Sequence, residues 1–253
     1  MSLFALPTAA PQPLAGRVVL LTGAHGGLGA AAAEACAAAG ATLVLLGRKV
    51  PKLNRVYDTV AQAGPEPVLY PLDLEGATPD DYAELAERIH AELGRLDGLL
   101  HCAAEFRGLT PLEHIDPAAF ARAIHVNLTA PWWLLQACLP LLRQAGDPSV
   151  VLAVDDPARV GQAYWGGYGV AQHGLRALVE MLAAELAGTQ VRVAGLQPGP
   201  MRTALRGRAY ADDLDPRARD AAAYAGACVT LLSPAGAAHR GTIWAPEPGD
   251  LPA

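Results

Sequence analysis

A glycine-rich segment between a buried strand and a helix most constrains what this chain can fold into. It reads Thr22-Gly23-Ala24-His25-Gly26-Gly27-Leu28-Gly29. Gly23 permits a sharp turn after the strand, Gly27 lets the backbone approach a phosphate, and Gly29 lets the helix and strand pack closely. A pyrophosphate can then lie at the helix N-terminus, where free N–H groups and the helix dipole favour an anion. The alternative is that the segment forms a purely structural turn. The place of the segment between a strand and a helix favours nucleotide binding.

Apolar runs alternate with helical stretches along the rest of the chain. Seven runs are expected as strands: Val18–Thr22, Ala41–Leu46, Pro67–Leu72, Leu96–Cys102, Ser149–Val154, Val191–Leu196 and Gly241–Trp244. Nearly every position in them is apolar, which predicts a parallel sheet covered on both faces. Between them, Thr78 and Asp116 each precede a proline as expected N-caps, and Gly40 is expected just after a helix. The predicted fold class is α/β, a Rossmann-type doubly wound parallel sheet of about seven strands with helices on both faces.

Composition limits the class of protein and its partners. Of the 253 residues, 52% are hydrophobic and 17% charged, which supports a large core and excludes general disorder. Residues 16–253 are expected to form a single domain, and residues 1–15 a loose Pro/Ala arm without the features of a signal peptide. The net charge is −6 and basic residues form no long run, so neither nucleic acid nor a membrane is an expected partner.

Cysteine spacing and the length of apolar runs predict the compartment. The four cysteines are far apart and form no CxxC pair, so buried thiols are expected and a metal site is not: Cys36, Cys102, Cys138 and Cys228. No apolar run reaches the roughly 20 residues that span a bilayer. A cytoplasmic location is therefore expected.

The end of the second expected strand discriminates between nicotinamide cofactors. An NAD-binding protein usually has Asp or Glu there to accept a hydrogen bond from the ribose 2′-hydroxyl. This chain has Arg48 and Lys49 instead. Arg48 can hold a 2′-phosphate through two parallel hydrogen bonds, with His25 as a second contact. The alternative is a solvated Arg-Lys pair, and on balance NADP(H) is favoured over NAD(H).

The chain resembles the short-chain dehydrogenase/reductase family over nearly its whole length. Five motifs carry the resemblance: TGxxxGxG at Thr22–Gly29, the adenine-binding acidic residue at Asp73, the helix-borne asparagine at Asn127, the active-site tyrosine at Tyr168 and the PG segment at Pro198-Gly199. The resemblance implies an oxidoreductase in which Thr203 bonds the nicotinamide carboxamide. It implies a cofactor site made of Gly23, His25, Gly27, Leu28, Gly29, Arg48, Asp73, Leu74, Ala103, Gln172, Pro198, Gly199 and Thr203.

Three positions depart from the family pattern. The family's NNAG reads His101-Cys102-Ala103-Ala104, and the loss of Asn is expected to remove hydrogen bonding that steadies the sheet. His101 and Cys102 are otherwise expected as ordinary buried residues. Family spacing places the catalytic Ser at Asp155 and the catalytic Lys at Gln172, with Asp156 as the neighbouring candidate if the register slips. The catalytic tetrad is therefore expected at Asn127, Asp155, Tyr168 and Gln172.

These replacements bear directly on proton transfer by Tyr168. In the family the Lys lowers the pKa of the Tyr and holds the nicotinamide ribose. A unit charge ~5 Å away at an effective dielectric of ~20 contributes about 3 kcal/mol, roughly two pKa units. Gln172 can still bond the ribose but carries no charge, and an ionised Asp155 raises the pKa of Tyr168 further. Tyr168 is therefore expected to stay protonated at neutral pH.

A protonated Tyr168 can donate a proton but cannot accept one. The favoured function is slow or specialised reduction of a small-molecule carbonyl by NADPH, with oxidation of the alcohol nearly absent. One alternative keeps Asp155 protonated in a dry site, where it donates to the substrate carbonyl. A second alternative is a non-catalytic nucleotide-binding member, a sensor or partner subunit with an eroded active site. Dehydration or isomerisation on the same fold is a third.

Residues outside the tetrad suggest how substrate and subunits are arranged. The segment Met201–Asp220 lies where the family places its substrate lid, and its mixed Arg and Asp residues predict a solvated, flexible loop. The alternative is a basic lip for an anionic or carrier-linked substrate. Tyr164 and Trp165 are candidates to line the substrate pocket. The resemblance implies a homodimer or homotetramer through the helices Asp116–Arg143 and Tyr168–Ala187. The apolar run Pro131–Leu135, in which Trp132 and Trp133 serve packing or subunit contact, is consistent with that interface.

Overall fold

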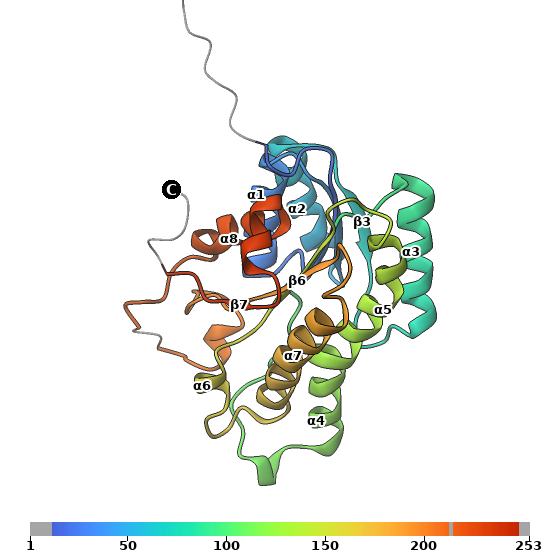
Figure 1. Ribbon diagram of the computed structural model, residues 1–253. Coiled ribbons are helices and arrows are strands. Elements are labelled where there is room, and N and C mark those ends of the chain that lie inside the picture. The colour runs from blue at the N-terminus through green and yellow to red at the C-terminus, as the bar shows by residue number, and fades with distance from the viewer. Residues whose placement is uncertain (1–11, 213–214, 248–253) are drawn as a thin grey trace, which may run out of the picture.

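Seven parallel strands form one sheet at the centre of the computed structural model, which describes residues 12–212 and 215–247 (Figure 1). The strands are β1 (Val18–Thr22), β2 (Thr42–Gly47), β3 (Val68–Pro71), β4 (Gly98–His101), β5 (Ser149–Ala153), β6 (Arg192–Leu196) and β7 (Ile243–Trp244). They lie in the order β3-β2-β1-β4-β5-β6-β7, and every neighbouring pair is parallel. The predicted doubly wound α/β fold is therefore confirmed.

Helices connect the strands. The α-helices of the described residues are α1 (Gly27–Ala38), α2 (Val50–Ala63), α3 (Pro79–Leu93), α4 (Pro117–Ile124), α5 (Ala130–Leu142), α6 (Pro157–Val160), α7 (Gly166–Glu185) and α8 (Ala225–Leu232). A π-helical turn, His125–Thr129, joins α4 to α5. Short 3-10 turns cover Leu112–His114, Arg206–Arg208, Ala221–Tyr224 and Pro234–His239. In the part of the chain that is described, no helix is both long and apolar enough to cross a bilayer.

The strands are mainly apolar because helices cover both faces of the sheet. In β1, Val18 and Leu20 belong to the core shared with α3, α5 and α7. The alternate residues Val19 and Leu21 belong to the core shared with α1, α2 and α8. Figure 1 shows these two helix layers on opposite sides of the sheet. Burial on both faces favours apolar residues, and the buried polar residues of β1, β4, β5 and β6 lie at strand ends: Thr22, His101, Ser149 and Arg192.

Local sequence signals place the helix ends as predicted. Thr78 and Asp81 form a reciprocal capping box at α3, in which the Thr78 N–H donates to Asp81 Oδ2 at 2.7 Å. Asp116 caps α4 by accepting from the Ala119 N–H at 2.9 Å. Gly40, after α1, has a φ of +94°, and a Cβ there would lie 2.9 Å from the Cα of Ala15. Both the conformation and the available space therefore require glycine.

The N-terminal boundary of the domain differs from the expectation. Leu14 is fully buried in the core that contains α1, and its N–H donates to the Ala39 carbonyl at 2.9 Å. Ala15 packs against Gly40. Residues 12–15 are thus part of the folded domain, and the expected loose arm does not extend to residue 15. Residues 1–11 lie outside the described residues.

The apolar run on α5 also differs from the expectation. Pro131, Leu134 and Leu135 are buried in the core of the chain itself, so most of this run does not indicate a subunit interface. The Trp133 ring lies 5.1 Å from the ring of His125, while Trp132 is 46% exposed. The expected helix Asp116–Arg143 is divided by the π-helical turn into α4 and α5.

The strand order reverses beside β1, and this reversal locates the site. The chain builds the sheet outward from β1 to β3 and then returns to place β4 on the other side of β1. Ligands of open parallel sheets bind at such a reversal, outside the carboxyl ends of the strands. Six of the predicted site residues follow directly or closely after strands at this edge: Gly23, Arg48, Asp73, Ala103, Asp155 and Pro198.

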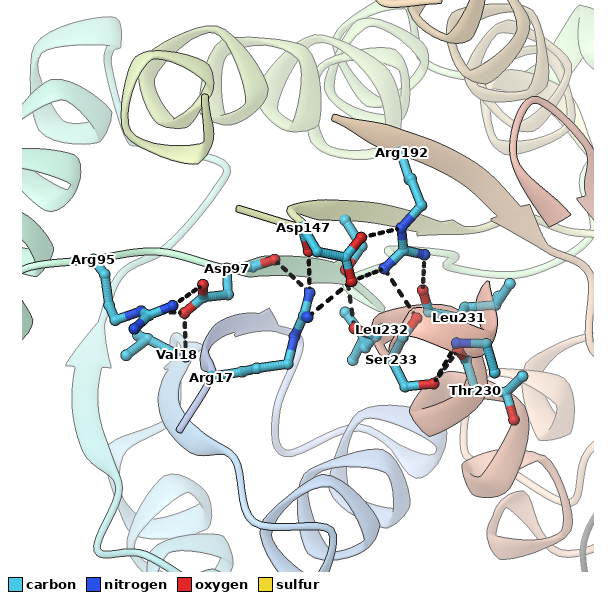
Figure 2. A network of polar contacts seen from close by, with 12 residues as sticks. Arg17, Val18, Arg95, Asp97, Asp147, Arg192, Thr230, Leu231, Leu232 and Ser233 are labelled. Carbon is cyan, nitrogen blue, oxygen red and sulfur yellow. Dashed lines mark hydrogen bonds and ion pairs between the residues drawn. The ribbon is translucent and has the colours of Figure 1, made fainter. Parts of the chain in front are cut away.

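At the opposite edge of the sheet, Asp147 joins three segments through ion pairs (Figure 2). It lies just before β5 and accepts from Arg17 at 3.0 Å and from Arg192, in β6, at 2.8 and 3.1 Å. Arg192 is 6% exposed and also donates to the carbonyls of Leu231 at 3.2 Å and Ser233 at 2.9 Å. The start of β6 is thereby tied to the end of α8.

Asp97, just before β4, extends this network toward the other strands. It accepts from the Arg95 guanidinium at 2.7 and 2.8 Å and from the Val18 N–H at 2.9 Å. The Asp97 carbonyl also accepts from Arg17 at 3.3 Å. The amino ends of β1, β4, β5 and β6 are therefore held together by charged groups, far from the carboxyl edge.

We predict that Asp147→Asn lowers the free energy of unfolding by about 2–4 kcal/mol, because the Arg192 guanidinium stays buried without its counter-charge. Denaturant unfolding monitored by circular dichroism measures the change. Glu87→Gln, at an exposed position on α3, is the matched control and should change the free energy by less than about 0.5 kcal/mol. Equal effects of the two substitutions would contradict the stabilising role of Asp147.

The same substitution should lose its effect in acid. Burial raises the pKa of Asp147, but the hydrogen bonds and charges of Arg192 and then Arg17 outweigh burial and lower it. A folded pKa below the unfolded value of about 3.9 means that the stabilisation is fully present above that value. It is lost as the pH falls through the lower folded pKa. The difference between wild type and Asp147→Asn should therefore shrink below about pH 4.

Candidate active site

The glycine-rich turn between β1 and α1 forms a cradle that side chains would fill. Gly23 has a φ of +69°, and a Cβ there would come within 2.6 Å of the Ala103 backbone. A Cβ at Gly29 would lie 2.2 Å from the Gly23 carbonyl oxygen, and one at Gly27 would lie 2.6 Å from the methyl group of Thr203. The predicted glycines therefore bring the segments after β4 and β6 close to the start of α1.

The start of α1 presents free N–H groups to this cradle. The helix begins at Gly27, and its N-cap Gly26 provides no side-chain cap. The first N–H groups of a helix have no partner within the helix, and the dipole favours negative charge beside them. The cradle and the uncapped N-terminus together fit the pyrophosphate of a dinucleotide.

Arg48 and Asp73 meet at the ends of β2 and β3. Arg48 Nη1 lies 3.8 Å from Asp73 Oδ2, and the Arg48 side chain is 43% exposed. Asp73 Oδ1 also accepts from the Glu75 N–H at 3.2 Å. Leu74 is buried in the core, so its main chain alone is placed to meet a cofactor. These residues lie where the adenosine end of a dinucleotide would lie if its pyrophosphate occupied the cradle.

Further positive charges surround the predicted contact His25. Its Nδ1 is buried against Gly47 and has no hydrogen-bond partner among the described residues. Burial lowers the pKa of His25, and the positive charges of Lys52, Lys49 and Arg48 lower it further. Sequence reasoning missed Lys52, although its position in the first turn of α2, three residues after Lys49, is a usable signal.

His101 compensates for the missing family asparagine. Its Nδ1 lies 2.8 Å from Thr22 Oγ1, which links the ends of β4 and β1. Burial lowers the pKa of His101 to about 4, so the imidazole is neutral at physiological pH. The replacement therefore keeps a hydrogen bond between the ends of these two strands. Cys102, next to it, is a free thiol that is only partly buried.

The side chain of Asn127 is hydrogen-bonded to the backbone of two other segments. It lies in the π-helical turn and is 1% exposed. Its Oδ1 accepts from the Glu105 N–H, and its Nδ2 donates to the carbonyls of Glu105 and Ala123, all at 2.8 Å. Asn127 thus fixes the segment after β4, and its place in the catalytic tetrad stays a prediction.

Tyr168 is hydrogen-bonded to Asp155, at the position where the family has Ser. Tyr168 Oη donates to Asp155 Oδ2 at 2.8 Å. Asp155 Oδ1 accepts from the Asp156 N–H at 2.7 Å and from the Arg159 guanidinium. In these contacts the Asp155 carboxyl group accepts from Tyr168, from the Asp156 N–H and from Arg159. Asp156 instead caps α6 by accepting from the Ala158 N–H at 3.0 Å.

Arg159 is the cation beside Asp155 and Tyr168, and sequence reasoning missed it. It lies one helical turn after Asp155, pairs with the Asp155 carboxylate and is 26% exposed. Its guanidinium carbon also lies 5.2 Å from the centre of the Trp165 ring. The spacing of an acid and a base four residues apart, directly after a buried strand, is the signal that could have found it.

Gln172 holds the loop that carries Asp155. It is 3% exposed, lies one turn after Tyr168 on α7, and its Oε1 accepts from the Asp155 N–H at 2.9 Å. Its amide nitrogen makes no hydrogen bond within the described part of the chain, which leaves that donor for a ligand. Gln172 thus brings no charge to Tyr168 but fixes the backbone of its partner.

The surroundings of Tyr168 favour its protonated form. Burial raises the pKa of Tyr168 well above its usual range, and the charge and hydrogen bond of Asp155 raise it further. The positive charge of Arg159 acts in the opposite direction but is the smallest of these effects. This arrangement agrees with the prediction from the sequence that Tyr168 stays protonated at neutral pH.

Two cavities lie beside these residues. One of about 1020 Å³ is lined by Asp155, Arg159, Pro198, Gly199, Arg206 and Tyr210, among others. A Cβ at Gly199 would come within 2.2 Å of the Tyr224 hydroxyl, which closes this part of the wall. The other, of about 250 Å³, is lined by Phe106, Tyr164, Trp165 and Tyr168, among others. The two candidates for the substrate pocket, Tyr164 and Trp165, thus share a cavity with Tyr168.

Known proteins match this chain in both sequence and structure. The family model of the short chain dehydrogenases matches residues 17–214. The uncharacterized oxidoreductase YciK of Escherichia coli K12 is 35% identical over 195 residues, 77% of each chain. A short-chain dehydrogenase structure from Pseudomonas syringae has a TM-score of 0.88 and 41% identity, covering 94% of this chain and 97% of that one. One from Escherichia coli CFT073, in complex with NADPH, has a TM-score of 0.87 and 32% identity, covering 92% and 98%.

The chain belongs to the short-chain dehydrogenase family. In this short-chain dehydrogenase, the lid segment Met201–Asp220 is packed more closely than expected. Leu205, Ala209 and Tyr210 contact the aromatic cluster of Phe106, Trp165 and Tyr168, in which the Phe106 and Trp165 rings stack at 4.9 Å. The expectation of a solvated loop is therefore wrong for this part of the lid.

Charge pairing within the lid also argues against a basic lip. Arg206 is only 7% exposed, pairs with Asp215 at 3.4 Å and stacks on Tyr210 at 4.7 Å. Arg217 pairs with Asp215 at 3.0 Å, and Arg202 pairs with Asp220 at 3.2 Å. Thr203, expected to bond the nicotinamide, accepts from the Arg206 N–H at 3.2 Å. Residues 213–214 lie outside the described residues.

Proposed function

We propose that this short-chain dehydrogenase binds NADP(H) and uses NADPH to reduce a small-molecule carbonyl slowly or with narrow specificity. The observation that carries the cofactor preference is the group of positive side chains Arg48, Lys49 and Lys52 near the end of β2. A 2′-phosphate is attracted there, whereas the carboxylate of an NAD-binding protein would repel it. The NADPH complex of the Escherichia coli CFT073 relative supports the same choice.

The direction of the reaction follows from the proton on Tyr168. Reduced nicotinamide supplies a hydride when it is bound. Tyr168 keeps its proton at neutral pH and is therefore an acid for carbonyl reduction, whereas its base form, which alcohol oxidation needs, is scarce. A general acid whose pKa lies far above the working pH loses part of the ~10²–10⁴-fold that such catalysis contributes. Reduction should thus be slow, and oxidation slower still.

A second function, nucleotide binding without turnover, is favoured by the packing of Tyr168. The Tyr168 side chain is 5% exposed, and its hydroxyl already donates to Asp155. Phe106 and Trp165 lie against its ring at 5.2 and 5.9 Å. A sensor or partner subunit would still require the cofactor cradle, but it would not require a Tyr168 hydroxyl that a substrate can reach.

We also propose a homo-oligomeric assembly and a cytoplasmic location. A homodimer or homotetramer through α5 and α7 is supported by exposed apolar side chains on these helices, namely Trp132, Val170 and Met181. A cytoplasmic location is supported by four cysteines that are all free thiols.

Arg48→Ala tests the cofactor preference. We expect it to weaken NADPH binding at least tenfold, about 1.4 kcal/mol, because a bidentate contact to the 2′-phosphate is lost, and to change NADH binding less than about twofold. Isothermal titration calorimetry measures both. Arg55→Ala, which removes the same charge from an exposed position on α2, should leave both affinities unchanged. Equal weakening of NADPH and NADH by Arg48→Ala would rule out its contact with the 2′-phosphate.

A carbonyl panel with NADPH, run beside the corresponding alcohols with NADP, tests the reaction itself. We expect reduction of at least one carbonyl and much slower oxidation at pH 7 with saturating cofactor.

The double substitution Asp155→Ser with Gln172→Lys should increase reduction at least tenfold if the site is an eroded form of the family tetrad. A decrease would indicate chemistry adapted to Asp155. NADPH binding without turnover of any carbonyl would favour the non-catalytic function, and similar rates in both directions would contradict the proposed direction.

A further inference from the structure

The hydrogen bonds around Tyr168 connect its hydroxyl to a water-accessible cavity. Among the described residues, the partner of Tyr168 Oη is Asp155 Oδ2, at 2.8 Å. Asp155 also lines the cavity of about 1020 Å³, whereas Tyr168 is not among the residues that line it. A proton that moves between this cavity and Tyr168 through hydrogen-bonded groups therefore passes through the Asp155 carboxyl group.

The other polar groups near Tyr168 are not suited to carry a proton. Gln172 Oε1 accepts from the Asp155 N–H, and a primary amide neither gains nor loses a proton at physiological pH. Asn127 is an amide as well, and both ends of its side chain are bonded to the main chain of Glu105 or Ala123. Asp155 is thus the group in this constellation that can change its charge.

The charges of the site require the Tyr168 proton to be replaced as it leaves. If Tyr168 gave its proton to a substrate without replacement, a phenolate and the Asp155 carboxylate would stand 2.8 Å apart. Arg159 pairs with Asp155 and can compensate one negative charge but not two. Two like charges at this distance in a buried site are strongly unfavourable, so one of the two oxygens must be protonated.

We propose that Asp155 is the proton relay of this site: it takes a proton from water in the cavity and passes it to Tyr168 Oη as Tyr168 gives its own proton to the substrate oxygen. Arg159 is the positioning residue that holds Asp155 for this transfer. The relay rests on the proposed carbonyl reduction. With Asp155 protonated on Oδ2, its hydrogen bond to Tyr168 reverses, and the phenol proton is free to point at the substrate.

The transfers balance without a charged tyrosine. The O–H bonds of Asp155 and Tyr168 break, and new O–H bonds form on Tyr168 and on the substrate oxygen. Tyr168 ends neutral, Asp155 ends as a carboxylate, and water in the cavity restores the Asp155 proton. The hydride that completes the reduction comes from the reduced dinucleotide.

Other charged groups near Asp155 are paired or distributed across the cavity. Arg159 and Asp156 come from α6 and the residue before it, and Tyr168 comes from α7. Across the cavity the lid contributes Arg206, Tyr210, Asp212, Asp215, Arg217 and Arg219, and the C-terminal segment contributes Glu247. Because acids and bases are mixed there, the direct contacts with Arg159 and Tyr168 should dominate the electrostatic surroundings of the Asp155 carboxyl group.

The pH dependence of reduction tests the relay. The rate with saturating NADPH and the best carbonyl of the panel should rise as the pH falls from about 8 to 5, because the relay takes its proton from water in the cavity. Asp155→Asn should lower the rate about 10²-fold or more and flatten the profile. Arg159→Gln removes the cation that holds Asp155 and should lower the rate and change the profile, and Arg159→Lys should restore both. Asp156→Asn is the matched control, with an unchanged profile.

A second measurement does not depend on turnover. The ionisation of Tyr168 can be followed by ultraviolet absorbance as the difference between each protein and its Tyr168→Phe counterpart. Asp155→Asn should lower the pKa of Tyr168 by about one unit or more, since a neighbouring negative charge is removed, while Asp156→Asn should not change it. An unchanged Tyr168 pKa in Asp155→Asn would overturn the coupling on which the relay depends.

The two measurements separate failure of the relay from failure of the proposed function. If Asp155→Asn keeps the rate and the pH profile of the wild type, the relay is wrong but carbonyl reduction stands. If the wild type binds NADPH and reduces no carbonyl at any pH, the proposed function is wrong, and the relay in reduction falls with it.

Discussion

The reversal of strand order beside β1 determines where every functional group of this chain lies. Because β2 and β4 lie on opposite sides of β1, the segments after them diverge and leave room at the carboxyl edge. Gly23 makes the turn out of β1 so tightly that a Cβ would meet the Ala103 backbone. The uncapped start of α1 follows at once. The ion pairs of Asp147 and Asp97 at the other edge hold the amino ends of β1, β4, β5 and β6 together (Figure 2).

The residues proposed to bind the cofactor follow the family pattern closely, whereas the residues proposed to transfer the proton depart from it. The cofactor half keeps the family's glycines and adds positive charge near the end of β2. The proton half replaces a direct cation beside Tyr168 with a neutral amide, Gln172, and with a carboxylate that is itself paired with Arg159. Relative to a Ser and a Lys, Asp155 and Gln172 lower the net charge of the site by two units, and Arg159 restores one unit. This difference is consistent with the proton that we propose for Tyr168 and with the relay that we propose for Asp155.

Much of the fold could be predicted because burial on both faces makes the strands mainly apolar. Every expected strand boundary lies within two residues of the observed one. The glycine-rich turn and the replaced tetrad positions could be located because they depend on spacing along the chain. Contacts between distant segments could not be predicted in this way. The His101–Thr22 hydrogen bond, the burial of Leu14 and the packing of Arg206 depend on neighbours that only the folded chain brings together. The Arg159–Asp155 pair is local, but its spacing alone does not show that it reaches Tyr168.

A crystal structure of the wild-type protein grown with NADPH near neutral pH is the most direct test of this account. It should place the phosphates against the N–H groups at the start of α1 and the 2′-phosphate beside Arg48. The Tyr168 hydroxyl should remain within hydrogen-bond distance of the Asp155 carboxyl group, at about 3 Å. A dinucleotide bound away from the glycine-rich turn, or a Tyr168 hydroxyl that has left Asp155 for another partner in this chain, would contradict it.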